Sequence, residues 1–138
     1  MVEYTERTKQ ILASMTLEEK AGQMLQIPYS EISQEDAVEW VEKRYVGSFL
    51  HVLGEEAQKL QDRAMKTRLG IPLIFGIDAI HGHALNNGAT VFPSQLGMSC
   101  SWNPELIRQM GRVTGSEVAA DGLHWTFSPV LCLGRDLR

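Results

Sequence analysis

The run from Ile71 to Asp78 constrains the fold of this chain more than any other feature. It is almost continuously apolar and ends in a single carboxylate. A strand of this kind is buried on both faces, as happens in parallel sheets whose two sides are covered by helices. The run therefore predicts an internal strand of an α/β fold.

The patterns on either side of this run support the same fold class. Strand-like and helical stretches alternate, and this alternation indicates about three parallel βα units. Helical spacing of apolar residues predicts helices, and short apolar stretches predict two further strands. The expected helices are 6–12, 16–25, 33–45, 55–69 and about 103–121, and the expected strands besides 71–78 are 46–53 and 123–133.

Several of these helices have recognisable ends. Thr16 followed by Glu19 fits a capping box, in which each residue bonds the backbone of the other. Asn103 followed by Pro104 is a typical helix start, because asparagine caps and proline suits the first helical position. Pro28 ends the helix that Thr16 begins. A long loop is expected between residues 79 and 101.

Composition excludes several classes of protein. With 138 residues and a net charge of −4, the chain shows no basic cluster for nucleic acid. It also has no apolar run near the roughly 20 residues that span a membrane. Cys100 and Cys132 are too few for a disulfide framework, and we expect both to be reduced and buried. The polar N-terminus shows no signal peptide, which predicts a cytoplasmic protein unless a leader has been removed.

Functional side chains of parallel α/β folds gather at the carboxyl ends of the strands. Asp78 stands at such an end, where a carboxylate can accept hydrogen bonds from hydroxyl groups or act as a base, nucleophile or metal ligand. His81 and His83 follow, and could either hold a metal or order the loop. His51 ends another expected strand and could line the same pocket, although a plain surface or packed histidine is the favoured interpretation there.

The last expected strand is followed by a second polar group. Arg135, Asp136 and Arg138 could bind sugar, phosphate or carboxylate oxygens, or could form an internal ion pair. His124 begins the strand and is expected to be structural. Trp125 is expected to be mostly core, although an aromatic ring near a strand end can also stack on a sugar.

Several consecutive segments match one known pattern in order over about residues 11–138. Together they resemble glycoside hydrolase family 3, with most likeness to its β-glucosidase and glucan exohydrolase branch. The matching segments are Met15-Thr-Leu-Glu-Glu-Lys20-Ala-Gly-Gln-Met24, Arg68-Leu-Gly-Ile-Pro-Leu-Ile-Phe-Gly-Ile-Asp78-Ala-Ile-His-Gly-His83, Gly88-Ala-Thr-Val-Phe-Pro93, Ser101-Trp-Asn-Pro-Glu-Leu106, Trp125-Thr-Phe-Ser-Pro-Val130 and Arg135-Asp136.

The resemblance implies a retaining, exo-acting β-glycosidase that removes terminal non-reducing β-D-glucosyl residues without a cofactor. It also implies a TIM-type (β/α)8 barrel followed by an α/β sandwich domain, with residues 1–138 forming the N-terminal segment of the barrel. Asp78 corresponds to an aspartate that binds hydroxyls of the terminal sugar. Arg138 is a second substrate-binding candidate, although Leu137 stands where the family has proline. His81 is a third.

The residues that would perform the chemistry are expected outside this segment. Retaining hydrolysis needs two carboxyl groups roughly 5 Å apart, and Asp78 matches neither the nucleophile nor the acid/base. We therefore expect the segment to be inactive alone and to associate with the remainder of the enzyme, which could be a second chain. The alternatives are a metal-dependent barrel hydrolase using Asp78, His81 and His83, and a non-catalytic sugar-binding fragment.

Overall fold

The computed structural model describes residues 4–130 and divides into two compact units, Met1–Phe75 (unit 1) and Gly76–Arg138 (unit 2). Strand β3 (Ile74–Ile77) contributes residues to both units. The strand pairs β1–β2 and β3–β4 are parallel, as the sequence predicts. Within residues 4–130, no helix is both long enough and apolar enough to cross a membrane.

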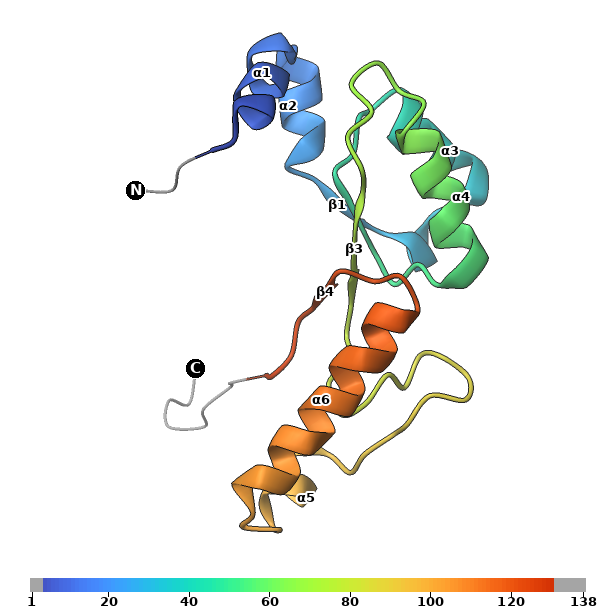
Figure 1. Ribbon diagram of the computed structural model, residues 1–138. Coiled ribbons are helices and arrows are strands. Elements are labelled where there is room, and N and C mark those ends of the chain that lie inside the picture. The colour runs from blue at the N-terminus through green and yellow to red at the C-terminus, as the bar shows by residue number, and fades with distance from the viewer. Residues whose placement is uncertain (1–3, 131–138) are drawn as a thin grey trace, which may run out of the picture. The chain divides into compact units, whose positions relative to one another are not determined.

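Unit 1 packs two neighbouring helices, α3 and α4, beside short strands (Figure 1). Its core includes buried apolar side chains of both helices and of β2, among them Val41 of α3, Phe49 of β2 and Leu60 of α4. The elements in chain order are α1 (Glu6–Ser14), α2 (Leu17–Gln23), β1 (Gln26–Pro28), the 3-10 turn η1 (Tyr29–Glu31), α3 (Gln34–Glu42), β2 (Ser48–Leu50) and α4 (Gly54–Ala64).

Strand β1 is an addition to the strands that the sequence predicts. Helix α2 ends at Gln23 rather than near residue 25, and the chain then pairs with β2 in the register Gln26↔Ser48. Gly22 explains the close approach of α2 to the chain before β2, because a Cβ at this position would collide with the carbonyl oxygen of Arg44. The side chain of Met24, expected on the apolar helix face, is largely exposed.

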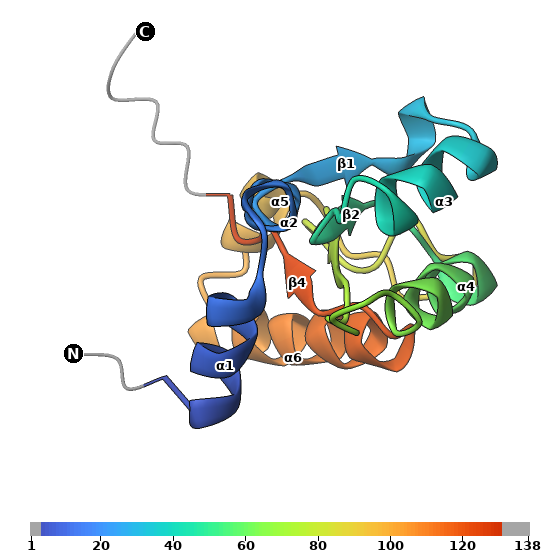
Figure 2. The same ribbon diagram turned by 90° about the horizontal axis from the view of Figure 1, so that it is seen from above.

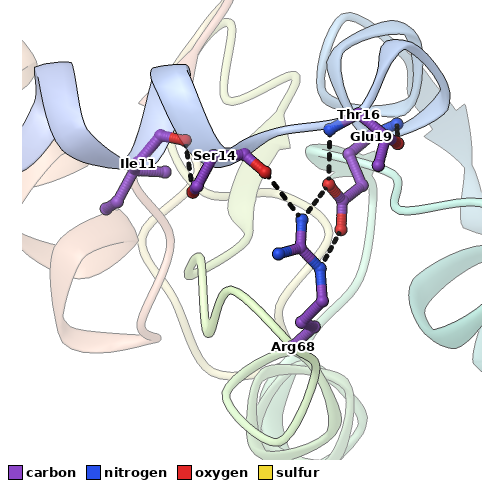
Figure 3. Close-up of polar contacts among 5 residues, drawn as sticks. All are labelled: Ile11, Ser14, Thr16, Glu19 and Arg68. Atoms are coloured by element: carbon purple, nitrogen blue, oxygen red, sulfur yellow. Dashed lines mark hydrogen bonds and ion pairs between the residues drawn. The ribbon is translucent and has the colours of Figure 1, made fainter.

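The capping box at the start of α2 forms as predicted. Thr16 Oγ1 accepts a hydrogen bond from the Glu19 amide at 3.2 Å, and Glu19 Oε2 accepts one from the Thr16 amide at 2.8 Å. Arg68 binds the same carboxylate through Nε and Nη2, and Nη2 also donates to the Ser14 carbonyl at 3.0 Å (Figure 3). The hydrogen bonds that the Glu19 carboxylate accepts hold its pKa below the ordinary value, and the one from Arg68 has the largest effect.

Unit 2 pairs the end of β3 with β4 in the register Gly76↔Trp125 and Ile77↔Thr126. The short helix α5 interrupts the loop expected between residues 79 and 101, and the long orange helix α6 follows it (Figure 2). Asn103 caps α6, as predicted. The elements of unit 2 after β3 are α5 (Gln95–Ser99), α6 (Pro104–Ala120) and β4 (Trp125–Thr126).

Several side chains of unit 2 are more exposed than the sequence suggests. The prediction of a buried Cys100 is wrong, because this free thiol is exposed at the end of α5. Trp125 is also not mostly core: it is 47% exposed, and its ring lies 4.5 Å from that of Phe127, measured between centroids. Among the described residues of unit 2, the buried apolar side chains are Ile77, Ala79, Val118 and Leu123, a core too small to cover Cys100 and Trp125 as well. Cys132 lies outside the described residues.

Candidate functional site

Asp78 stands where the sequence places it, directly after β3. The last three residues of the strand before it are buried, its first residue Ile74 is exposed, and Asp78 itself is partly exposed. The Phe127 amide donates a hydrogen bond to the Ile77 carbonyl at 3.1 Å, which carries the pairing of β3 and β4 past the end of both strands. The carboxylate thus lies at the carboxyl end of two paired parallel strands, the position at which α/β folds bind ligands.

His81 closes the base of the loop that follows Asp78. Its Nδ1 lies 2.8 Å from the Phe92 carbonyl oxygen, and its own carbonyl accepts a hydrogen bond from the Phe92 amide, also at 2.8 Å. A carbonyl oxygen can only accept, so Nδ1 carries the proton. In the neutral ring, Nε2 is therefore a hydrogen-bond acceptor.

His83 has a different environment from His81. It is fully buried, and its Nε2 lies 3.1 Å from Asp121 Oδ2, at the end of α6. The two imidazoles therefore bond different partners, His81 a backbone carbonyl and His83 a carboxylate. Within residues 4–130, no three His, Cys, Asp or Glu side chains come together as a metal site, so the metal-dependent alternative finds no three-ligand cluster there.

Unit 2 has a cavity of about 560 Å³, and its lining begins at Ala79, the residue that follows Asp78 in the chain. The three residues that follow Asp78, from Ala79 to His81, line one part of it. Ser128 also lines it and donates a hydrogen bond to the Ala79 carbonyl at 2.9 Å, which fixes the chain just beyond the strand. The other lining side chains come mainly from α5, α6 and β4 and are mostly apolar, including Phe92, Met98, Ile107 and Met110.

One polar group in the cavity wall is unsatisfied. Thr126 Oγ1 is buried and has no hydrogen-bond partner among the described residues. A buried hydroxyl without a partner costs free energy, and such groups in native structures call for an explanation. Thr126 lies on β4 opposite Ile77, the residue before Asp78.

The other predicted site residues divide into two groups. Arg135, Asp136 and Arg138 lie outside the described residues, so the second polar group stays a prediction. His51 follows β2 in unit 1 and is partly buried, with a positive φ of 62°. The cavity described above is lined by residues of unit 2 alone, and His51 is not among them.

Sequence reasoning missed the acidic residues of α6 that hold the loop after β3. Glu117 binds the amide and hydroxyl of Thr90, at 2.9 and 2.7 Å, and Asp121 binds His83. One signal was available in the sequence. Two acids near the carboxyl end of a helix oppose its dipole, and a spacing of four places them on one helix face.

Comparison with known proteins identifies the family. The family described as glycosyl hydrolase family 3 N terminal domain matches residues 16–138. A periplasmic beta-glucosidase from Salmonella typhimurium is 36% identical over 131 residues, which is 93% of this chain and 16% of that protein.

Solved structures give the same result. An exo-1,3/1,4-beta-glucanase from a Pseudoalteromonas species matches with a TM-score of 0.79 and 30% identity, over 99% of this chain and 19% of its own. A beta-glucosidase from Listeria innocua in complex with glucose matches with a TM-score of 0.77 and 34% identity, over 96% of this chain and 20% of its own.

This chain therefore spans about a fifth or less of these three relatives. The predicted α/β fold, the N-terminal portion of a TIM-type barrel, is confirmed by these matches. The chain belongs to glycosyl hydrolase family 3 and corresponds to part of its N-terminal domain.

Proposed function

We propose that the protein containing this chain is a retaining, exo-acting β-glycosidase that hydrolyses terminal non-reducing β-D-glucosyl residues. Membership of the family supports this activity, and so do the printed activities of the relatives, which are beta-glucosidases and an exo-beta-glucanase. The observation that carries the proposal is the position of Asp78, at the carboxyl end of a largely buried parallel strand and directly before the residues that line a cavity.

The proposed role of Asp78 is to bind the terminal sugar. An ionised carboxylate only accepts hydrogen bonds, and its two oxygens can take one from each of two adjacent hydroxyls. Bonds to a charged acceptor are short and strong. Where they strengthen as the sugar distorts toward the transition state, they raise kcat as well as affinity. His81, with Nε2 as an acceptor, is proposed as a weaker contributor beside the cavity.

The chemical step itself is proposed to use two carboxyl groups from another part of the enzyme. One would act as the nucleophile and the other as the acid/base, at a separation of roughly 5 Å. Arg138 is proposed as a further sugar-binding group. The remainder of the enzyme is the proposed partner of this segment, and the proposed location is the cytoplasm.

The test is hydrolysis of an aryl β-D-glucoside by the complete protein and by its Asp78→Ala variant. Each hydrogen bond to a charged group contributes about 1.5–3 kcal/mol, so loss of two should lower kcat/KM by about a hundredfold or more. Asp62→Ala, at an exposed position on α4, is the matched control and should stay within about twofold of the unmodified protein. An unchanged kcat/KM for Asp78→Ala would remove Asp78 from the site.

Two further measurements address the segment and its partner. Residues 1–138 alone should not hydrolyse the glucoside, and hydrolysis by this segment in the absence of any partner would contradict the assignment of the catalytic carboxyls. Intact-mass measurement of the purified protein should show the remainder of the enzyme, either on the same chain or as a second one. Cell fractionation tests the proposed compartment.

A further inference from the structure

The loop that follows Asp78 is attached to α6 at two points. Thr90 donates two hydrogen bonds to the Glu117 carboxylate, and His83 Nε2 bonds Asp121. Glu117 and Asp121 are four residues apart, so they lie on one face of the helix about one turn apart. In Figure 1 this loop, drawn in yellow, folds back alongside the orange helix α6. The loop has two limbs, a first one that contains His83 and a second one that contains Thr90. One side chain from each limb therefore holds the loop to α6.

The two limbs of the loop are also tied to each other. Gly82 bridges to Val91, and His81 pairs with Phe92 through backbone and ring. Gly82 has a φ of 99°, and a Cβ there would collide with the Thr90 carbonyl. Because the limbs touch at this point, a shift of His83 would also move the residues between it and Asp78.

Burying His83 costs more free energy than burying an apolar side chain that only fills the same space. His83 has no exposed surface, and its Nδ1 has no hydrogen-bond partner within the described part of the chain. An unpaired buried polar atom costs free energy, whereas an apolar side chain of similar volume would avoid that cost. What an apolar side chain would not supply is the bond from Nε2 to Asp121, which fixes where the loop lies on the helix.

We propose that His83 is a positioning residue: through its bond to Asp121 it holds the loop after β3, and thereby sets the place of Asp78 and His81 at the sugar site. Its imidazole does not touch the substrate. This inference rests on the proposed function, because it assumes that Asp78 binds sugar. It assigns to the buried His83 and its partly exposed partner Asp121 a part in substrate recognition beyond that of stabilising the fold.

The test compares two substitutions of His83 in the complete protein. His83→Leu fills a similar volume without a donor, and should lower kcat/KM for the aryl β-D-glucoside by about ten- to a hundredfold, the cost of a small displacement of a binding group. His83→Gln carries an amide N–H that can reach Asp121, and should restore kcat/KM to within about fivefold of the unmodified protein. His124→Leu, at an exposed position of the same unit, is the control for replacing a histidine and should lower kcat/KM much less than His83→Leu does.

A second comparison separates positioning from general stability. If His83 acts through Asp78, then His83→Leu should cause little further loss of kcat/KM in the Asp78→Ala background, because the effects of coupled residues do not add. The thermal unfolding midpoint of His83→Leu should stay within a few degrees of the unmodified protein. Equal losses in both backgrounds would overturn the proposal, as would failure of His83→Gln to restore activity.

The two proposals fail in different ways. If Asp78→Ala retains full activity, the assignment of Asp78 to the sugar site is wrong and the positioning role falls with it. If Asp78→Ala loses activity while His83→Leu stays within about twofold of the unmodified protein, only the positioning role is wrong. If His83→Leu does not fold, His83→Gln and Asp121→Leu test the proposal in its place. Asp121→Leu is expected to lower kcat/KM as a folded His83→Leu would.

Discussion

Arg68 binds the carboxylate of Glu19 across 49 residues of the chain. Its Nε lies 3.0 Å from Oε1 and its Nη2 lies 2.5 Å from Oε2, so the contact has the forked geometry that only arginine provides (Figure 3). The same carboxylate caps α2, and the same guanidinium bonds the carbonyl of Ser14, at the end of α1. One ion pair thus joins the first two helices to the segment that leads into β3.

This pair predicts a pH-dependent contribution to stability. The pKa of Glu19 is lowered in the folded protein, so its contribution is present above the ordinary glutamate value of 4.5 and is lost as pH falls through the folded value. Glu19→Gln should therefore lower the thermal unfolding midpoint by several degrees at pH 7, and the difference from the unmodified protein should shrink below pH 4.5. Thermal unfolding followed by circular dichroism between pH 3 and pH 7 measures it.

Glu35 provides the control for this measurement. It is also a glutamate in the first turn of its helix, α3, and its side chain is exposed. Glu35→Gln should change the unfolding midpoint much less than Glu19→Gln does. A Glu19→Gln difference that stays constant down to pH 3 would show that the ionised carboxylate is not what Arg68 recognises.

Two glycines that lie within helices should respond to alanine in opposite directions. Gly22 faces the backbone carbonyls of Arg44 and Tyr45, so the added methyl group should cost about 1–3 kcal/mol in the free energy of unfolding. Gly111 in α6 has no described atom within 4 Å of the Cβ position. There, alanine should be neutral or stabilise by up to about 1 kcal/mol. Chemical denaturation of both variants checks the contrast, and equal effects would contradict it.

Two threonines in unit 2 form a second matched pair, tested by valine, which has the same shape without the hydroxyl. Thr90 donates its hydroxyl to Glu117, so Thr90→Val should lower the free energy of unfolding by about 1–2 kcal/mol. The buried hydroxyl of Thr126 has no partner among residues 4–130, so Thr126→Val should be neutral or stabilising. Denaturant unfolding distinguishes them. Destabilisation by Thr126→Val would indicate that its hydroxyl is bonded by a group outside those residues.

Much of the local structure could be predicted because its causes lie within a few residues. The capping box of Thr16 and Glu19 forms, and so does the cap of α6 at Asn103. The apolar run before Asp78 forms a strand with its carboxylate at the end, as expected, but the strand is shorter, Ile74–Ile77, and Ile74 is exposed. Strand β1 was missed because three residues carry no periodic pattern, and only pairing with β2 makes them a strand.

The parallel α/β class, the helix starts and the strand-end place of Asp78 can be read from the chain, since each depends on neighbouring residues. Which His bonds a carboxylate and which lines the cavity depends on contacts between distant parts of the chain. His83 meets Asp121 across 38 residues, and Thr90 meets Glu117 across 27. Such contacts form only after the intervening chain has closed into a loop. The entropy lost in that closure is offset by packing over the whole unit, and a short sequence pattern does not predict whether that packing is sufficient.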